Sequence, residues 1–268
     1  KKYKLLILPD NIRLNKSLQA KLADYMRSGG KILASGESCL WENRDEFALD
    51  LGILFEGKSD YTPDYLDTTD LLPTNNGVMV MYSQSYRFAL VGAEKLADRQ
   101  NPYFNRNASH FCSHQHTPNN RQKSGPGAAI TKNAGYIGWK VFEEYASMGS
   151  LHLKELAIVM IDKLLGENKT LSVNLPDRGI VTMMHQPQHN RYIVHLLFAH
   201  TSIRGKDTEV VEDLIPLFNT KLSVKLPGKP ARVLLQPQNV PVDFEFQSDT
   251  LSLTVDQFTC HQIISIEY

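Results

Sequence analysis

The densest group of side chains that could do chemistry lies in the middle of the sequence. His110, His114 and His116 place three imidazoles within seven positions, together with the thiol of Cys112. Imidazole and thiolate groups are ligands that zinc and copper prefer. Their spacing matches no standard zinc pattern, so a polar loop whose side chains bond locally or line a neighbouring pocket is the simpler interpretation. We therefore assign no metal ligands to this group.

A second group, the sequence Ser-Gly-Glu-Ser-Cys at residues 35–39, follows an apolar run that we interpret as a buried strand. Asp10 follows an earlier run, and both groups would lie at the carboxyl edge where open α/β sheets bind ligands. A nucleophile elbow needs the pattern Gly-x-Ser/Cys-x-Gly, but Leu40 stands at the second glycine position. The first turn also lacks the glycines of a phosphate cradle. We predict neither a nucleophile nor a cofactor here.

Hydrolysis of a glycosidic bond needs two carboxylates that face each other across that bond. The chain offers several acids but no motif that places a pair, so we assign no catalytic residue. The acids considered are Glu37, Asp60, Asp64, Glu143 and Glu144. Several aromatic residues have rings that could stack on sugars, although packing in the core or at its rim is the default interpretation. They are Trp41, Trp139, Tyr61, Tyr65 and Tyr103.

The elements that must position these groups begin with alternating strand and helix signals. Residues 5–8 form a short apolar run typical of a buried parallel strand. Asn15 is a candidate helix N-cap, and apolar residues at helical spacing continue to Met26. Residues 31–35 give the next strand. The pattern predicts a βαβ unit and a parallel sheet with helices on its faces.

The region that follows is less regular. We predict a short helix at 45–51, strands at 78–81 and 88–91, and a long polar loop at 98–127 that is functional or disordered. A hairpin of residues 128–131 and 136–142 comes next. A second helix begins after Ser150 and ends at Gly166, where it completes an α/β domain of residues 1–168.

After this boundary the apolar residues recur with a period of two. Short strands separated by Pro, Gly and Asn turns predict a small antiparallel β-sandwich over residues 169–268. We expect strands at 180–184, 192–199, 222–226, 232–235, 242–246, 251–255 and 262–266.

Composition excludes several classes of function. The 29 Lys and Arg residues balance 29 Asp and Glu, so no cationic field favours nucleic acids or anionic membranes. No run approaches the roughly 20 apolar residues of a spanning helix. Three distant cysteines make a disulfide framework unexpected, and the compartment stays open. The chain opens without Met, directly before a strand, so we expect it to be a piece of a longer polypeptide.

The order of these elements resembles the C-terminal half of glycoside hydrolases similar to family 42 β-galactosidases. Those enzymes have a catalytic (β/α)8 barrel, then a flavodoxin-like, amidotransferase-like trimerisation domain, then a β-sandwich. The segments that carry the resemblance span almost the whole chain: 3–10, 22–37, 114–118, 191–197, 211–217, 229–235 and 261–264.

The resemblance implies that the catalytic carboxylates lie on a barrel outside this chain, so the fragment alone would be inactive. The α/β domain would make subunit contacts in a homo-oligomer and help to wall an active site that binds a carbohydrate. We interpret His114, His116 and Asn119 as the residues that face this sugar. Two alternatives stay open: a carbohydrate-binding module that uses the aromatic, polar region 61–116, and a metal-dependent hydrolase that uses His110–His116.

Overall fold

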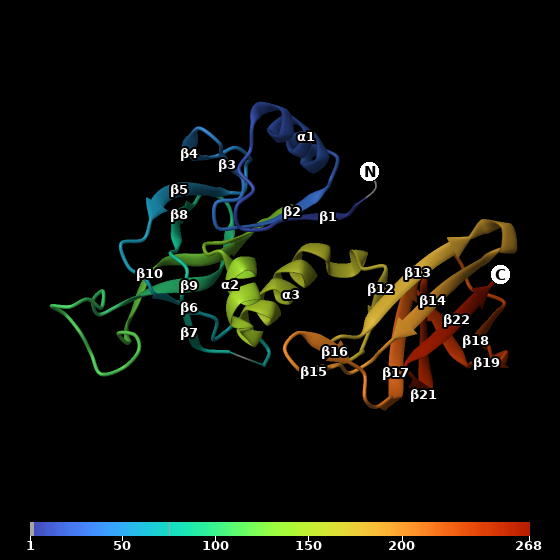
Figure 1. Cartoon of the computed structure of the whole chain (residues 1–268). Helices are drawn as coiled ribbons and strands as arrows, with labels where there is room; N and C mark the ends of the chain where they lie inside the picture. Colours follow the sequence, from blue (N-terminus) through green and yellow to red (C-terminus); the bar gives the residue numbers. More distant parts are fainter. Residues whose placement is uncertain (1–2, 75) are drawn as a thin grey trace. The chain divides into compact units, whose positions relative to one another are not determined.

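A computed structural model describes residues 3–74 and 76–268 of the chain (Figure 1). The chain divides into two compact units, Lys1–Asn168 and Lys169–Tyr268. Among the described residues, the first unit contains two clusters of buried hydrophobic residues and the second contains one. None of the described helices combines the length and the apolar character needed to cross a membrane.

A seven-stranded mixed sheet forms the centre of the first unit. Its strands follow the order β1-β2-β11-β10-β9-β6-β7, and only β1, β2 and β11 pair in parallel. The strands are β1 (Leu5–Leu8), β2 (Lys31–Ser35), β11 (Ala134–Ile137), β10 (Asn119–Ile130), β9 (Glu94–Pro102), β6 (Asp64–Asp67) and β7 (Val78–Met81). Two small sheets accompany it, made by β3 (Leu40–Trp41) with β4 (Arg44–Phe47) and by β5 (Ile53–Lys58) with β8 (Tyr86–Leu90).

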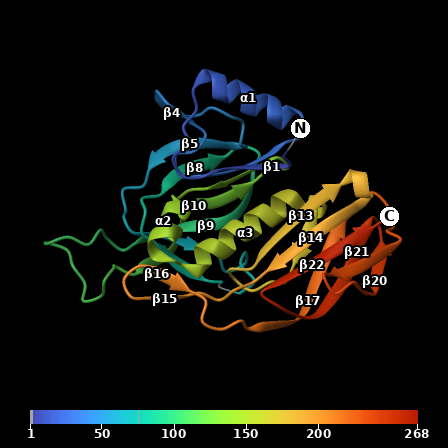
Figure 2. The ribbon, with the colours of Figure 1, turned by 45° about the vertical axis from the view of Figure 1, so that its right-hand side comes forward.

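The three α-helices found among the described residues of this unit cover the two faces of the sheet, as Figure 2 shows for α1 and α3. They are α1 (Lys16–Arg27), α2 (Val141–Met148) and α3 (Leu151–Leu165). Side chains of β2 alternate between the faces: Ile32 and Ala34 belong to the core that contains Leu22 of α1, whereas Leu33 packs with Leu156 and Met160 of α3. The α1 cap is the one expected, because Asn15 Oδ1 accepts a hydrogen bond from Leu18 N at 3.0 Å.

The predicted flavodoxin-like parallel sheet is not confirmed. Parallel pairing ends at β11, and the strands beyond it pair antiparallel. The predicted helix at 45–51 is instead β4 and the bends after it, and residues 141–142 of the predicted hairpin begin α2. The flanks of the predicted loop 98–127 belong to a long antiparallel ribbon of β9 and β10. Polar residues form this ribbon because neighbouring strands satisfy its backbone groups, which composition alone does not reveal.

The second unit is a sandwich of two antiparallel sheets around one core. One sheet has the order β12-β17-β21-β20 and the other β13-β14-β22-β18-β19. The strands are β12 (Leu171–Val173), β13 (Ile180–Gln186), β14 (Arg191–Leu197), β17 (Pro216–Lys225), β18 (Arg232–Gln236), β19 (Val240–Pro241), β20 (Phe244–Gln247), β21 (Thr250–Thr259) and β22 (His261–Glu267). A separate hairpin joins β15 (Ser202–Arg204) and β16 (Thr208–Val210). A 3-10 turn, η1 (Gly166–Asn168), ends the first unit, and a second one, η2 (Pro187–His189), lies in this unit.

Candidate functional site

The three residues predicted to face a sugar lie on or beside the loop 103–118, which joins β9 to β10 and extends away from the sheet (green in Figure 1). His114 is exposed and His116 is half-buried. Asn119 is half-buried at the first position of β10. The structure therefore places His116 and Asn119 at the base of one loop, and His114 further out on it.

Polar side chains hold this loop in shape. Asn107 Oδ1 accepts hydrogen bonds from the backbone N of Ser109 and of His110, each at 2.9 Å. At the start of the loop, Asn105 Nδ2 donates to Asp60 O at 2.6 Å, and Asn105 Oδ1 accepts from Thr62 N at 3.2 Å. These bonds explain why the segment is rich in asparagine: short amide side chains bond to nearby backbone groups.

The histidines of the loop do not gather around one point. The His110 ring lies 6.2 Å from that of Phe104, and the His116 ring packs edge-on to Tyr82 at 5.5 Å. Within residues 3–74 and 76–268, no group of three or more His, Cys, Asp or Glu side chains is placed to hold a metal ion. The metal-hydrolase alternative therefore has no geometric support in this part of the chain.

A cavity of about 360 Å³ lies where the loop returns to the sheet. Tyr65 OH donates to Thr117 O at 2.6 Å, which fixes the end of the loop against β6. Tyr103 is 64% exposed, so its ring is accessible from solvent. Aromatic rings beside a few polar groups are the usual lining of small-molecule sites. The cavity is lined by Tyr65, Tyr103, Pro118, Asn119 and Arg121.

A second cavity, of about 290 Å³, contains Tyr82, the residue on which His116 packs. Glu144 of α2 holds the backbone at this cavity, because it accepts hydrogen bonds from Tyr82 N at 2.8 Å and from Ser83 N at 2.9 Å. Glu144 is only 6% exposed, and Ser83 Oγ also donates to it. This carboxylate therefore anchors the backbone that carries Tyr82. Lys140, Glu143, Ser147 and Met148 complete the cavity.

Asp64 is a buried acid in β6, next to Tyr65 of the first cavity. Its carboxylate is fully buried, accepts a hydrogen bond from Trp139 Nε1 at 2.7 Å and another from Ser85 Oγ, and lies 3.8 Å from Arg99 Nη1. Burial raises the pKa of Asp64 to about 6, against the opposing effect of these hydrogen bonds and of the Arg99 charge. Because Asp64 directly precedes Tyr65, its bonds hold in place the strand that carries this cavity residue.

The second group singled out in the sequence, residues 35–39 with Asp10, forms a structural joint. Asp10 Oδ1 accepts from Ser35 Oγ at 2.5 Å, and Asp10 Oδ2 accepts from Glu143 N at 2.6 Å in the first turn of α2. Burial raises the pKa of the Cys39 thiol to about 12, which opposes the thiolate form that a nucleophile needs. Cys39, Cys112 and Cys260 are all free thiols.

Glu37 lies among cations at this joint. Arg13 Nε donates to it at 2.8 Å, Tyr86 OH at 2.7 Å and Lys58 Nζ at 3.4 Å. Burial favours the neutral acid, but these hydrogen bonds and the charges of Arg13 and Lys58 lower the pKa of Glu37 to about 2. Like Asp64 and Glu144, this carboxylate is occupied by groups of its own unit.

The low pKa of Glu37 predicts a pH dependence of stability. A carboxyl whose pKa is depressed on folding stabilises the fold above its unfolded value, 4.5, and loses this contribution as the pH falls towards 2. We expect Glu37→Gln to flatten the fall in the free energy of unfolding between about pH 5 and pH 2. Urea titrations of both proteins across this range provide the measurement. Equal slopes for variant and parent chain would contradict the assignment.

No protein-family model and no curated protein matches the chain. Several solved structures are similar to it. Alpha-L-fucosidase isoenzyme 2 from Paenibacillus thiaminolyticus is 39% identical, with a TM-score of 0.95 over 99% of this chain and 41% of that one. The predicted resemblance to glycoside hydrolases is confirmed. The beta-galactosidase from Bacillus circulans sp. alkalophilus is 12% identical, with a TM-score of 0.55 over 99% of this chain and 33% of that one.

A catalytic mutant of Gan42B, a GH42 beta-galactosidase from G. stearothermophilus, is also similar, with 11% identity and a TM-score of 0.51 over 99% of this chain and 32% of that one. At such identities the β-galactosidases share the fold alone. The chain spans 41% of the length of the fucosidase and about a third of the length of these β-galactosidases.

Of the other aromatic residues considered for sugar stacking, Trp139 is fully buried and Trp41 lies under the Arg44 guanidinium, 5.1 Å from its ring centre. Tyr65 and Tyr103 remain in the cavity. The sequence did not single out Tyr82 or Arg121, and it marked Pro118 only as part of the segment 114–118 that carries the family resemblance. Their positions depend on the pairing of β6, β7, β9 and β10, and the local sequence does not predict this pairing.

Proposed function

We propose that this chain is the non-catalytic C-terminal region of a glycoside hydrolase of the fucosidase and β-galactosidase type. In this role it assembles subunits into a homo-oligomer and supports a catalytic barrel that lies N-terminal to it in the same polypeptide. The observation that carries the proposal is the match at 39% identity along 99% of this chain, which accounts for only 41% of the fucosidase.

The side chains support this assignment in a second way. Three of the five acids considered for catalysis are engaged by their own unit: Glu37 by Arg13, Asp64 by Trp139, and Glu144 by backbone N–H groups. A retaining or inverting site needs two carboxylates free to meet one glycosidic bond. This supports our assignment of the bond-breaking groups of the parent enzyme to the proposed barrel.

Within the parent enzyme, we assign the loop 103–118 to the wall of an active site. Its side chains bond among themselves, so the loop keeps a defined shape while it extends from the sheet. His114 is presented to solvent, Asn119 lines the first cavity, and His116 packs on Tyr82, which lines the second. Imidazole and amide groups at such a place donate and accept hydrogen bonds with sugar hydroxyls.

A turnover assay tests the absence of catalytic groups. We expect the purified chain to hydrolyse nitrophenyl α-L-fucopyranoside and nitrophenyl β-D-galactopyranoside no faster than buffer, because the carboxylates above are held by their own unit. The homologous fucosidase provides the positive control. Turnover that co-purifies with the chain and is lost in a Glu143→Gln variant would overturn the proposal, since Glu143 is exposed at a cavity.

Assembly is a separate expectation. If the first unit makes subunit contacts by itself, the chain forms a defined oligomer at micromolar concentration. Multi-angle light scattering over a dilution series measures the mass. A strict 30.3 kDa monomer at every concentration would count against assembly through this chain alone.

A carbohydrate-binding module is the second candidate function. The cavity of Tyr65, Tyr103, Asn119 and Arg121 favours it, because its size and lining suit a single pyranose ring. This function differs from the first in one respect: it requires the isolated chain to hold a sugar without a barrel.

A further inference from the structure

The long strand β21 of the second unit is fully paired along one edge and only partly paired along the other. β21 pairs with β17 from Thr250 to Thr259 along its first edge. Along its second edge it pairs with β20 only from Thr250 to Leu253. Residues 254–259 therefore have no strand on that side among the described residues.

The path of the chain explains the gap. β19 pairs with Leu234 and Leu235 of β18, in the opposite sheet of the sandwich. The chain then crosses to the sheet of β21 and begins β20 at Phe244. Because Val242 and Asp243 are used for this crossing, they do not continue β20 along the rest of β21.

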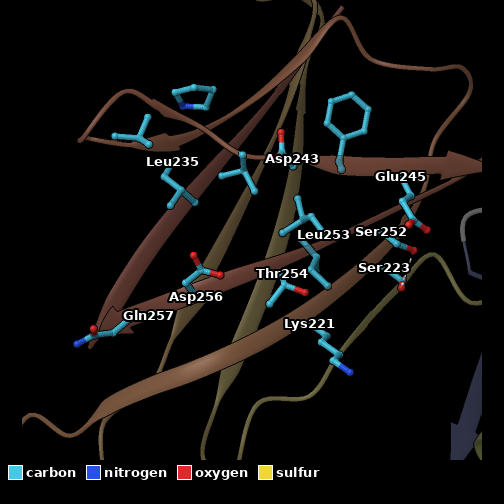
Figure 3. Close-up of a pocket in the computed structure, with 15 residues that line it drawn as sticks. Lys221, Ser223, Leu235, Asp243, Glu245, Ser252, Leu253, Thr254, Asp256 and Gln257 are labelled. Carbon is cyan, nitrogen blue, oxygen red and sulfur yellow. Dashed lines mark hydrogen bonds between the residues drawn. The ribbon is translucent and has the colours of Figure 1, made fainter.

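A cavity of about 840 Å³ lies beside the unpaired edge (Figure 3). Figure 3 shows Asp256 and Gln257 on the part of β21 that runs past the start of β20, and Leu235 and Asp243 across the cavity from them. The cavity therefore includes the space beside this edge, where a neighbouring strand would lie, and it also reaches Lys221 and Ser223 of β17.

An unpaired edge presents a row of N–H and C=O groups that an extended chain satisfies by adding a strand. Side chains of an added strand alternate between its two faces. On the inner face they would meet the half-buried Leu235, Val242 and Phe244. On the outer face they would meet Thr254 and Asp256.

Charge decides which kind of strand fits. The lining carries three carboxylates, Asp243, Glu245 and Asp256, and one cation, Lys221. All three acids are exposed, and no ion pair between the described residues involves them. A second copy of the chain would bring the same acidic edge against this one, and like charges across strands are destabilising. A strand with basic residues gains from the same carboxylates.

We propose that the edge of β21 at residues 254–259 binds an extended segment of a partner protein in which apolar residues alternate with Lys or Arg. The segment adds to the sheet as a strand where β20 leaves off. Its apolar side chains pack towards Leu235 and Phe244, and its cations lie beside Asp243 and Asp256.

The test uses the whole chain and two labelled peptides, acetyl-KVKVKVK-amide and acetyl-EVEVEVE-amide, in fluorescence anisotropy at low ionic strength. We expect saturable binding of the basic peptide alone, and weakening when salt is added because the outer contacts are charge pairs. Amide hydrogen exchange of the same complex locates the site. Protection should rise at residues 254–259 and stay unchanged on β17, which is already paired.

The matched variants change the same charge at different places. Asp243→Lys with Asp256→Lys should weaken the basic peptide at least about tenfold, a loss of about 1.4 kcal/mol. Asp207→Lys with Asp213→Lys, at exposed positions of the same unit outside the cavity, should not. Equal binding of both peptides, no saturation, or protection elsewhere would overturn the proposal. Self-association that the first pair of substitutions abolishes would also overturn it, because the edge would then belong to a second copy.

Discussion

Replacing Asp64 by Ala is expected to lower the free energy of unfolding of the first unit by about 3–5 kcal/mol. The substitution removes the acceptor of Trp139 Nε1–H and of Ser85 Oγ–H, both inside the core. It also leaves the Arg99 guanidinium, 5% exposed, without its nearest carboxylate. A buried cation without its partner is among the costliest defects that one substitution introduces.

Urea unfolding followed by tryptophan fluorescence measures this effect directly, because Trp139 is one of only two tryptophans. Asp60→Ala provides the matched control: it removes the same group from an exposed position four residues away and should change stability by less than about 0.5 kcal/mol. A loss of less than about 1 kcal/mol in Asp64→Ala would show that water replaces the lost partners and that the carboxylate does not support β6.

The isosteric Asp64→Asn variant separates shape from charge. The amide oxygen still accepts a hydrogen bond from Trp139 Nε1, but the neutral side chain no longer carries the negative charge that faces the Arg99 guanidinium. Because burial raises the pKa of Asp64 to about 6, its ionised form costs stability as the pH rises from 3.8 towards 6. Asn at this position should remove this part of the pH dependence. The stability contributed at Asp64 falls as the pH rises, whereas the stability contributed by Glu37 rises with pH.

Local patterns were sufficient to predict some elements of this fold. α1 begins after its asparagine cap and α3 ends at Gly166 because helices and their caps depend on neighbours within one turn. The strands of the second unit follow the period-two pattern for the same reason: each strand has one face in the core.

The region between β2 and β11 could not be predicted in this way. The polar residues of β9 and β10 are strand because these strands pair with each other and β9 pairs with β6, some thirty positions earlier in the chain. Such pairing depends on contacts between distant residues and leaves no periodic trace in a polar sequence. The parallel pairing that residues 5–35 predict therefore holds for β1, β2 and β11 but not for the rest of the sheet.

The same limit applies to the site. Tyr103 and Asn119 stood out by residue type, but the cavity exists only because the β9–β10 ribbon brings them together and Tyr65 reaches across from β6. Asp64 and Glu144 were considered as catalytic acids. Their burial, which the sequence does not display, makes them supports instead.

As a test of the carbohydrate-binding function, Tyr103→Ala is expected to abolish measurable binding of a pyranose sugar to the isolated chain. Isothermal titration with L-fucose, D-galactose and their short oligosaccharides should show weak, millimolar binding for the parent chain, since the cavity holds about one ring. Tyr103 presents the most exposed ring of the cavity, and stacking on such a ring supplies most of the apolar contact available to a sugar. Its loss should weaken binding at least about tenfold.

Phe111→Ala is the matched control for Tyr103→Ala, because Phe111 is an aromatic residue of the same loop that is 73% exposed and does not line the cavity. Equal losses in both variants would assign the effect to the loop as a whole. If titration of the parent chain gives no heat with any sugar, the carbohydrate-binding function is ruled out. The assembly role is unaffected, because a site whose other wall belongs to the barrel binds sugar only in the full enzyme. Binding that depends on Tyr103, without turnover, would show that the sugar contact resides in this chain and the chemistry elsewhere.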